Sequence, residues 1–238
     1  MHNEPQSWFR DKNHIPDAPK DADHTYPVKT NRTKRVTGYV TSMIDRKLMP
    51  YHSSLERTFI QIVGLDPRCL ELHAQPMPID YSTPDGLRSY TADFYLRLQS
   101  GHQLLVETKP EADFLSERNV YKWPLIKERT RQLGLGFAWM NETELFRQPR
   151  FDNITMLQLY RSCAIDLNIA NLIDRALAQH PVIALQDLEH LSQDSLLLRD
   201  TVWALIVRRH LWSNFDQPLN AASLIQKVSA PFVDRTRN

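Results

Sequence analysis

The chain has 238 residues, with 29 Lys and Arg against 28 Asp and Glu, a formal net charge of +1. Apolar residues make up 42% and charged residues 24%, the composition of an ordinary folded protein. No apolar run approaches the roughly 18 residues of a membrane-spanning helix, and the start lacks a signal-peptide core. Two cysteines, Cys69 and Cys163, exclude a disulfide scaffold and a cysteine-based zinc site. We therefore expect a cytoplasmic protein of one or two domains with no membrane partner.

The near-zero net charge is an average over unlike segments. Residues 28–57 contain seven Lys and Arg against two Asp and Glu, whereas residues 58–152 contain 11 basic against 13 acidic side chains. A basic stretch of this length suits a segment that follows DNA phosphates, or it is a solubilising tail beside a domain. Near-neutrality therefore does not exclude DNA.

In chain order, residues 1–27 carry four prolines among polar residues and predict an irregular segment. Ser53 or Ser54 can cap a helix that ends near Gly64. Three strand-like runs follow, with turns at Thr83–Gly86 and Ser100–Gly101; they are Cys69–Ile79, Tyr90–Leu98 and Gln103–Thr108.

A polar helix over Ser116–Leu133, kinked or split at Pro124, and a short buried strand over Gly136–Met140 complete this part. Beyond Phe151 the pattern is mostly helical, over 154–178, 184–191 and 195–211, with a further short helix or ordered tail over Ala221–Val228. The predicted organisation is an irregular segment 1–27, an α/β domain 28–150 with a basic lead-in, and a helical domain 151–238.

Candidate catalytic residues lie at the ends of the predicted strands. Glu107 and Lys109 are two residues apart in one strand and therefore share a face of the sheet. Asp93 begins the strand before it, and the thirteen residues between Asp93 and Glu107 allow a hairpin that brings the two carboxylates together. Glu56, on the preceding helix, is a third candidate carboxylate.

These residue types suit phosphodiester hydrolysis. Mg²⁺ prefers carboxylate oxygens and water to His or Cys, and a lysine can orient the attacking water or neutralise developing charge. The alternative interpretation is that Glu107 and Lys109 form a structural ion pair at a strand edge. The sequence contains no phosphate-binding Gly-x-x-x-x-Gly-Lys motif and no Gly-x-Ser-x-Gly motif, so other nucleotide and nucleophile chemistries have no support.

The residues resemble the TnsA family of endonuclease subunits of heteromeric bacterial transposases. The resemblance covers about residues 30–148 and rests on Ser54-Leu55-Glu56-Arg57, Tyr90-Thr91-Ala92-Asp93-Phe94 and Val106-Glu107-Thr108-Lys109-Pro110. It implies a restriction-endonuclease-like core of the PD-(D/E)xK type, with Glu56, Asp93 and Glu107 as Mg²⁺ ligands, Mn²⁺ as a possible substitute, and Lys109 as the catalytic lysine. The family's Pro-Asp is Ala92-Asp93 here, and some members have Gln at the position of Glu107.

The resemblance also implies a place in transposition. The chain would cleave the 5′, non-transferred strand at transposon ends, beside a DDE-type transposase subunit, TnsB, in the nucleoid of a bacterium. The C-terminal part is similar to the family's helical, winged-helix-like domain, which contacts the AAA+ ATPase regulator TnsC. There we expect Leu196, Leu197 and Trp203 in the core. The residues expected to contact DNA are basic: Lys29, Arg32, Lys34, Arg35, Lys122 and Lys127.

Two alternative functions stay open on the sequence alone. The first is a restriction-type or repair nuclease that acts without partners. The second is a non-catalytic DNA-binding adaptor in which the carboxylates are structural.

Overall fold

The computed structural model describes residues 36–228. The expected irregular segment 1–27 and the basic residues Lys29 to Arg35 lie outside this range. The chain divides into two units, Met1–Arg147 and Gln148–Asn238, three residues before the boundary drawn from the sequence. Across the described residues, no helix has both the length and the apolar character needed to cross a bilayer.

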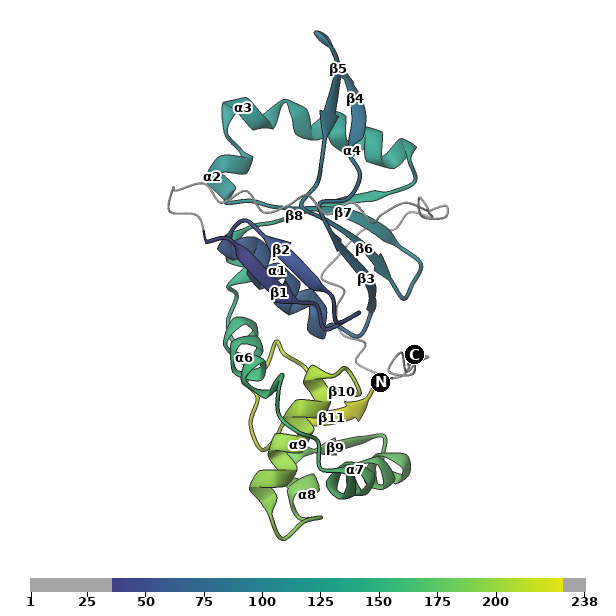
Figure 1. Cartoon of the computed structure of the whole chain (residues 1–238), viewed down its shortest axis with the longest axis vertical. Coiled ribbons are helices and arrows are strands. Elements are labelled where there is room, and N and C mark those ends of the chain that lie inside the picture. The colour runs from purple at the N-terminus through teal and green to yellow at the C-terminus, as the bar shows by residue number, and fades with distance from the viewer. Residues whose placement is uncertain (1–35, 229–238) are drawn as a thin grey trace. The chain divides into compact units, whose positions relative to one another are not determined.

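A four-stranded mixed sheet forms the centre of the first unit (Figure 1). Its strand order is β3-β6-β7-β8, with antiparallel pairing between the first three strands and parallel pairing of β7 with β8. Helices α1 and α4 lie on opposite sides of this sheet, which confirms the mixed α/β class expected from the sequence. The elements are β3 (Cys69–Ala74), β6 (Phe94–Leu98), β7 (Gln103–Thr108), β8 (Gly136–Met140), α1 (Ser54–Leu65) and α4 (Lys122–Gln132).

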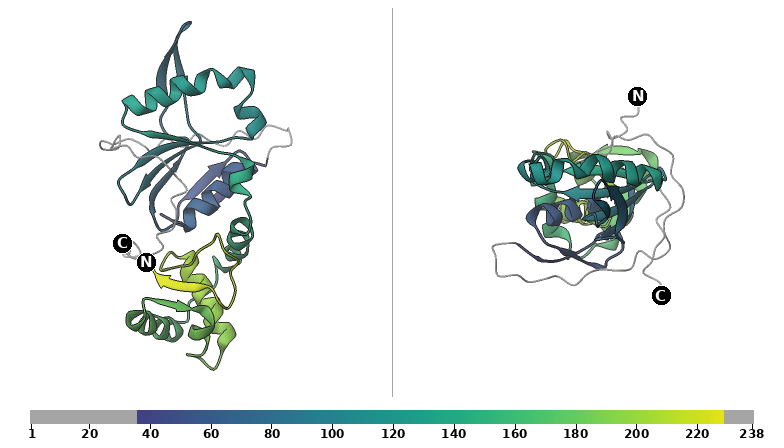
Figure 2. Two further views of the ribbon diagram at one scale, coloured as in Figure 1. Left: turned by 180° about the vertical axis from the view of Figure 1, so that it is seen from behind. Right: turned by 90° about the horizontal axis from the view of Figure 1, so that it is seen from above.

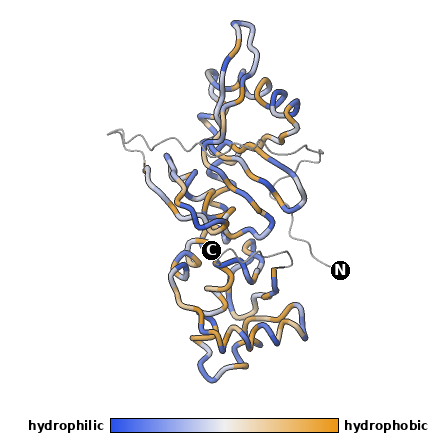
Figure 3. Tube along the Cα trace, turned by 45° about the vertical axis from the view of Figure 1, so that its right-hand side comes forward, coloured by the Kyte–Doolittle hydropathy of each residue, from blue (hydrophilic) through white to orange (hydrophobic). Residues whose placement is uncertain are grey.

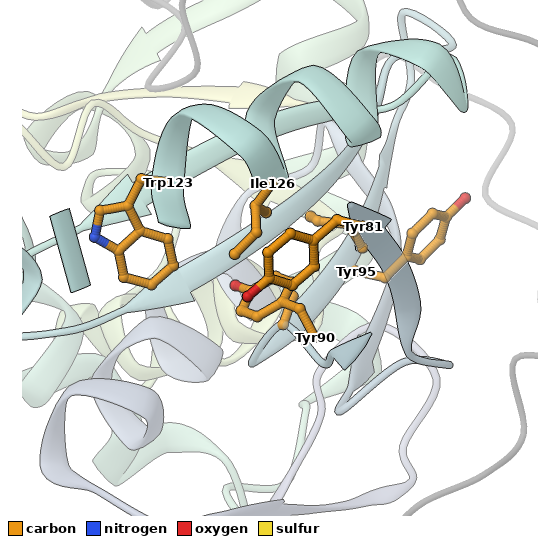
Figure 4. Packing of buried hydrophobic residues seen from close by; sticks show 7 residues of the cluster. Tyr81, Tyr90, Tyr95, Trp123 and Ile126 are labelled. Atoms are coloured by element: carbon orange, nitrogen blue, oxygen red, sulfur yellow. The ribbon is translucent and has the colours of Figure 1, made fainter. Parts of the chain in front are cut away.

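The two faces of the sheet have different side chains. Phe94 pairs with Val106 across β6 and β7, and its ring lies 4.8 Å from that of Phe59 on α1, so this face is apolar. The register partners Tyr95 and Leu105 point the other way and pack with Trp123 and Ile126 of α4 (Figure 4). Figure 3 shows hydrophobic residues along the central strands, as a sheet covered on both faces requires.

One glycine lies in close contact with a side chain across the pairing of β7 with β8. Gly136 lies opposite Leu104, and a Cβ atom at residue 136 would lie 2.4 Å from Leu104 Cδ2. A larger residue there would make the end of the Leu104 side chain shift.

Two hairpins were not predicted as such. β1 (Gly38–Thr41) and β2 (Leu48–Tyr51) pair antiparallel ahead of α1, in four-residue strands too short to give a clear alternation. β4 (Ile79–Thr83) and β5 (Gly86–Tyr90) form a second hairpin that projects from the sheet (Figure 2). The expected Thr83–Gly86 turn joins its strands, with Gly86 at φ +120°.

The prediction of one strand over Cys69–Ile79 is wrong: β3 ends at Ala74, and β4 begins only at Ile79. Gln75 adopts φ +48°, and Pro76 and Pro78 have no backbone N–H to donate to a sheet. The chain therefore leaves the central sheet after Ala74 and re-forms as β4.

The helix predicted over Ser116–Leu133 is split, but at Tyr121 and not at Pro124. Residues 111–132 form three helices, two of them within the predicted span, and Pro124 lies in the first turn of α4, where a backbone N–H has no partner within the helix. Gly134, at φ +73°, follows α4 as expected. The other two helices are α2 (Glu111–Phe114) and α3 (Glu117–Val120), and α5 (Glu142–Leu145) ends the unit.

The second unit combines helices with a small antiparallel sheet of order β10-β11-β9. Asn153 on α6 ties the helix to the loop between β10 and β11, donating to the carbonyls of Phe215 and Gln217 at 2.8 and 2.7 Å. The elements are α6 (Arg150–Leu157), a 3-10 turn (Gln158–Tyr160), α7 (Leu167–Gln179), β9 (Val182–Ala184), α8 (Leu185–Glu189), α9 (Ser195–Val207), β10 (Leu211–Trp212) and β11 (Leu224–Lys227).

Three predictions for this unit are corrected. The single helix 154–178 is interrupted, because Asp166 caps a new helix, α7, by accepting from the N–H groups of Asn168 and Ile169. The short helix or ordered tail expected over Ala221–Val228 contains strand β11 and no helix. Leu196 and Leu197, expected in the core, are 67% and 40% exposed, whereas Trp203 is buried as expected.

Candidate active site

Glu107 and Lys109 meet at the carboxyl end of β7. The strand alternation puts both on the face that α4 covers, and Lys109 Nζ lies 3.3 Å from Glu107 Oε1. The Glu107 side chain is 7% exposed and that of Lys109 is 27% exposed, so the pair runs from the core outwards.

The other oxygen of Glu107 accepts a hydrogen bond from a buried phenol. The Tyr90 hydroxyl, at the end of β5, donates to Glu107 Oε2 at 2.6 Å. Burial and the adjacent Glu107 carboxylate raise the pKa of Tyr90 well above its ordinary value, so this hydroxyl stays a proton donor.

Asp93 directly precedes β6 and is fixed against the end of β7. The backbone N–H and the hydroxyl of Thr108 both donate to Asp93 Oδ2, at 2.7 and 2.9 Å. The Asp93 carbonyl accepts from the N–H of Gln75 at 2.7 Å. The hairpin predicted between Asp93 and Glu107 is present, and it holds the aspartate at the strand end that carries Glu107 and Lys109.

The carboxylates form one electrostatic group. Burial raises the pKa of Asp93 from 3.8 to about 8, with the negative charges of Glu107 and then Glu56 adding to the effect, while the hydrogen bonds from Thr108 lower it. This balance is typical of a buried carboxyl group that lies close to other negative charges.

Glu56 has a structural role in the arrangement seen here. Ser53 caps α1 by accepting from the N–H of Glu56 at 3.1 Å, and Glu56 Oε2 accepts from the N–H of His52 at 2.7 Å. The reciprocal contacts resemble a capping box displaced by one residue. Glu56 is therefore close enough to influence Asp93, but its side chain is turned to the start of the helix.

The donor set suits Mg²⁺, because the site supplies carboxylate oxygens and no sulfur or imidazole ligand is required. In the described part of the chain, however, no three His, Cys, Asp or Glu side chains converge closely enough to hold a metal ion as they stand. Each candidate carboxylate accepts from a donor of the protein: Tyr90 and Lys109 for Glu107, Thr108 for Asp93, and His52 for Glu56.

An aromatic stack fixes the backbone at Lys109. Trp139 Nε1 donates to the Lys109 carbonyl at 2.8 Å, and the Lys109 N–H donates to the Met140 carbonyl at 3.1 Å. The Phe114 ring stacks on Trp139 at 3.8 Å and on Trp123 at 4.4 Å between ring centroids. The catalytic candidate is thus held on a rigid element.

The two described basic candidates lie on α4. Lys122 Nζ lies 4.1 Å from the Trp123 ring centroid and 5.8 Å from that of Tyr90, next to the buried network, and Lys127 is exposed. Four further candidates, Lys29, Arg32, Lys34 and Arg35, lie outside the described residues.

Sequence reasoning missed the residues that hold the site together. Tyr90 was read only as the start of a strand, and Thr108 and Trp139 carried no chemical signal. The alternation along β7 places Thr108 on the opposite face from Glu107. Its contact with Asp93, however, follows only from the pairing of β6 with β7.

A family model of the TnsA-like endonuclease N-terminal domain matches residues 66–142. The matched segment runs from the start of the sheet through β8 and contains Asp93, Glu107 and Lys109, whereas Glu56 precedes it. The resemblance to TnsA is therefore confirmed over this segment, and it indicates a nuclease related to TnsA of Tn7. No curated protein matches the chain.

Proposed function

We propose that the chain is the Mg²⁺-dependent DNA endonuclease subunit of a heteromeric transposase and cleaves the 5′ strand at transposon ends. The observation that carries the proposal is the grouping of Asp93, Glu107 and Lys109 at one end of β6 and β7, inside the segment that matches the endonuclease family. Hydrolysis of DNA by an enzyme of this kind needs a carboxylate pair and a lysine on a rigid strand end.

Asp93 and Glu107 would hold the metal, with Glu56 as a third ligand after its side chain leaves the helix cap. Bound Mg²⁺ would polarise the scissile phosphate and lower the pKa of a bound water. Lys109 would orient the attacking water and balance the charge that develops on the phosphate. Its contact with Glu107 keeps the ammonium beside a proposed metal ligand.

DNA contact by the chain alone should be weak and dependent on salt. The first unit offers Lys122 beside Tyr90 and an exposed Lys127 on the same helix, and the basic residues Lys29 to Arg35 precede them in the chain. Each phosphate contact adds to the slope of affinity against salt concentration. We expect partner subunits to supply most of the binding energy.

The second unit would bind the partners. After α6 and the 3-10 turn, its order of helix, strand, two helices and two strands, with the last strand in the middle of the sheet, supports a winged-helix-like domain. Three leucines in the segment Leu191–Leu197, before and at the start of α9, are 40–67% exposed, which favours a protein partner over DNA on this face. We propose contact with a TnsC-like ATPase through this unit, and action beside a TnsB-like transposase.

The test is 5′-strand nicking at the ends of the element by the assembled complex. Asp93→Ala should reduce 5′ cleavage by at least about 100-fold, because a metal ligand is lost, while 3′ joining by the partner transposase persists. Asp80→Ala, at an exposed aspartate on β4, is the matched control and should cleave normally. Unchanged 5′ cleavage by Asp93→Ala would refute the site.

The same assay separates the two alternative functions. Efficient cleavage by the isolated chain, without partners, would favour a restriction-type or repair nuclease. Absence of Asp93-dependent cleavage and of Asp93-dependent divalent-ion binding would favour a non-catalytic adaptor.

A further inference from the structure

Tyr90 is the residue that connects the projecting β4–β5 hairpin to the acidic site. It ends β5, lies three residues before Asp93, and is only 9% exposed. Its ring makes edge contacts with Trp123 and Phe137, with centroids 6.1 and 6.4 Å apart. These contacts fix the position of the phenol, so its hydroxyl is aimed at Glu107 by packing.

The two oxygens of Glu107 have different surroundings. Oε1 lies 3.3 Å from Lys109 Nζ, and Lys109 is the more exposed of the two side chains. Oε2 accepts from the buried Tyr90 hydroxyl at 2.6 Å and therefore faces the aromatic core. The outward oxygen is the one that a ligand reaching Lys109 would also meet.

We propose that Tyr90 is a positioning residue, which holds the core-side oxygen of Glu107 so that the Lys109-side oxygen is presented to the metal. The inference rests on the proposed function, because it assigns the orientation of one proposed ligand. It adds a residue outside the carboxylate and lysine set, and it makes the base of the β4–β5 hairpin part of the active site.

The physical reason is the cost of an unpaired carboxylate oxygen against aromatic rings. Without the hydroxyl, Oε2 would lose the donor that it has in its present position, and Glu107 would rotate to find another. That rotation removes the fixed orientation that a bound metal would use. Loss of a partner that orients a metal ligand typically weakens metal affinity by about 10–100-fold.

The chain offers a matched control in the same cluster. Tyr95 is 4% exposed, and its hydroxyl donates to Gln103 Oε1 at 2.8 Å, with no contact to a proposed ligand. Figure 4 shows Tyr95 on the opposite side of the cluster from Trp123. Tyr95→Phe therefore removes one buried hydroxyl and one hydrogen bond, as Tyr90→Phe does, without altering Glu107.

The experiment measures Mn²⁺ binding to the DNA-free full chain by electron paramagnetic resonance, for the parent protein, Tyr90→Phe, Tyr95→Phe and Asp93→Ala. We expect Asp93→Ala to abolish site binding, Tyr90→Phe to raise the Mn²⁺ dissociation constant by about 10–100-fold, and Tyr95→Phe to leave it unchanged. Urea unfolding of each variant serves as the control and should show that the two Tyr→Phe proteins are folded and comparably stable.

The outcomes separate the two hypotheses. Equal or tighter Mn²⁺ binding by folded Tyr90→Phe, with binding still dependent on Asp93, would overturn the role of Tyr90 and leave the proposed nuclease site standing. Equal weakening in Tyr90→Phe and Tyr95→Phe would also overturn it, since the effect would come from the core. Absence of Asp93-dependent binding in the parent protein would overturn the metal site and the inference together.

Discussion

The two faces of the central sheet divide stability from chemistry. On the α1 face, Phe59, Phe94 and Val106 are at most 1% exposed and carry no polar atoms in their side chains. On the α4 face, tyrosines and tryptophans surround Glu107, whose side chain is 7% exposed. A buried charge costs free energy unless it is paired, and Tyr90 and Lys109 supply the partners that keep this one in the core.

On the α4 face, these hydroxyl and indole donors each have a specific acceptor within the protein. Tyr90 donates to Glu107, Tyr95 to Gln103, Trp123 to Phe114 and Trp139 to Lys109. Substitutions on the α4 face should consequently change activity, and those on the α1 face should change the free energy of unfolding. Four predictions test this separation.

The largest effect is expected for Lys109→Ala. Loss of the ammonium should reduce 5′-strand nicking by the assembled complex by about 10²–10³-fold with the fold retained, because one charge-stabilising group at the reacting phosphate disappears. Lys227→Ala, which removes an ion pair with Asp174 in the second unit, is the control. Normal nicking by Lys109→Ala would break the assignment of chemistry to this face.

Phe59→Ala should act on stability instead. The ring is fully buried against Phe94, so the truncation should lower the free energy of unfolding by about 3–5 kcal/mol in urea titrations. Leu87→Ala, at a site 71% exposed, should change it by less than about 0.5 kcal/mol. A Phe59→Ala loss no larger than that of Leu87→Ala would show that the apolar face does not carry the stability.

Asp93→Asn should stabilise the metal-free protein in alkaline solution. The pKa of Asp93 is raised to about 8 in the folded state, so the folded chain binds its proton more tightly than the unfolded chain. This tighter proton binding contributes to the free energy of unfolding fully below about pH 4, and the contribution is lost as the pH rises through about 8. Asparagine has no charge to bury and can still accept from Thr108.

The melting temperature in EDTA checks this prediction. The melting temperature of Asp93→Asn should exceed that of the parent protein by several degrees at pH 8.5, and the difference should narrow towards pH 5. A change of about 1 kcal/mol shifts Tm by about 2–4 °C in a chain of this size. Asp80→Asn, on the hairpin surface, should show no such gap. A gap independent of pH would contradict the linkage.

Trp139→Phe should have the smallest of the four effects. It keeps the stack on Phe114 but loses the hydrogen bond to the Lys109 carbonyl, so nicking should fall about tenfold as Lys109 becomes less precisely placed. Trp123→Phe is the matched variant, because its indole also stacks on Phe114 but donates to a different carbonyl. Equal nicking rates for the two variants would show that the stack, and not the hydrogen bond, positions Lys109.

The sequence by itself determined the class of the fold and the candidate residues. A Ser cap before an apolar stripe predicted α1, alternation predicted β7 with Glu107 and Lys109 on one face, and the order of acids predicted a hairpin that joins Asp93 to them. These features depend on local propensity and on spacing of two or 3.6 residues, which a single chain displays directly.

Only the tertiary structure decided how the site is held. The exposure of Leu196 and Leu197 depends on what packs over α9. The break after Ala74 and the cap at Glu56, by contrast, have local signals in Pro76, Pro78 and the spacing of Ser53 and Glu56. The hydrogen bond from Tyr90 to Glu107 joins residues 17 positions apart on strands of different sheets. Contacts of this kind arise from packing between elements, and no local pattern in the sequence encodes them.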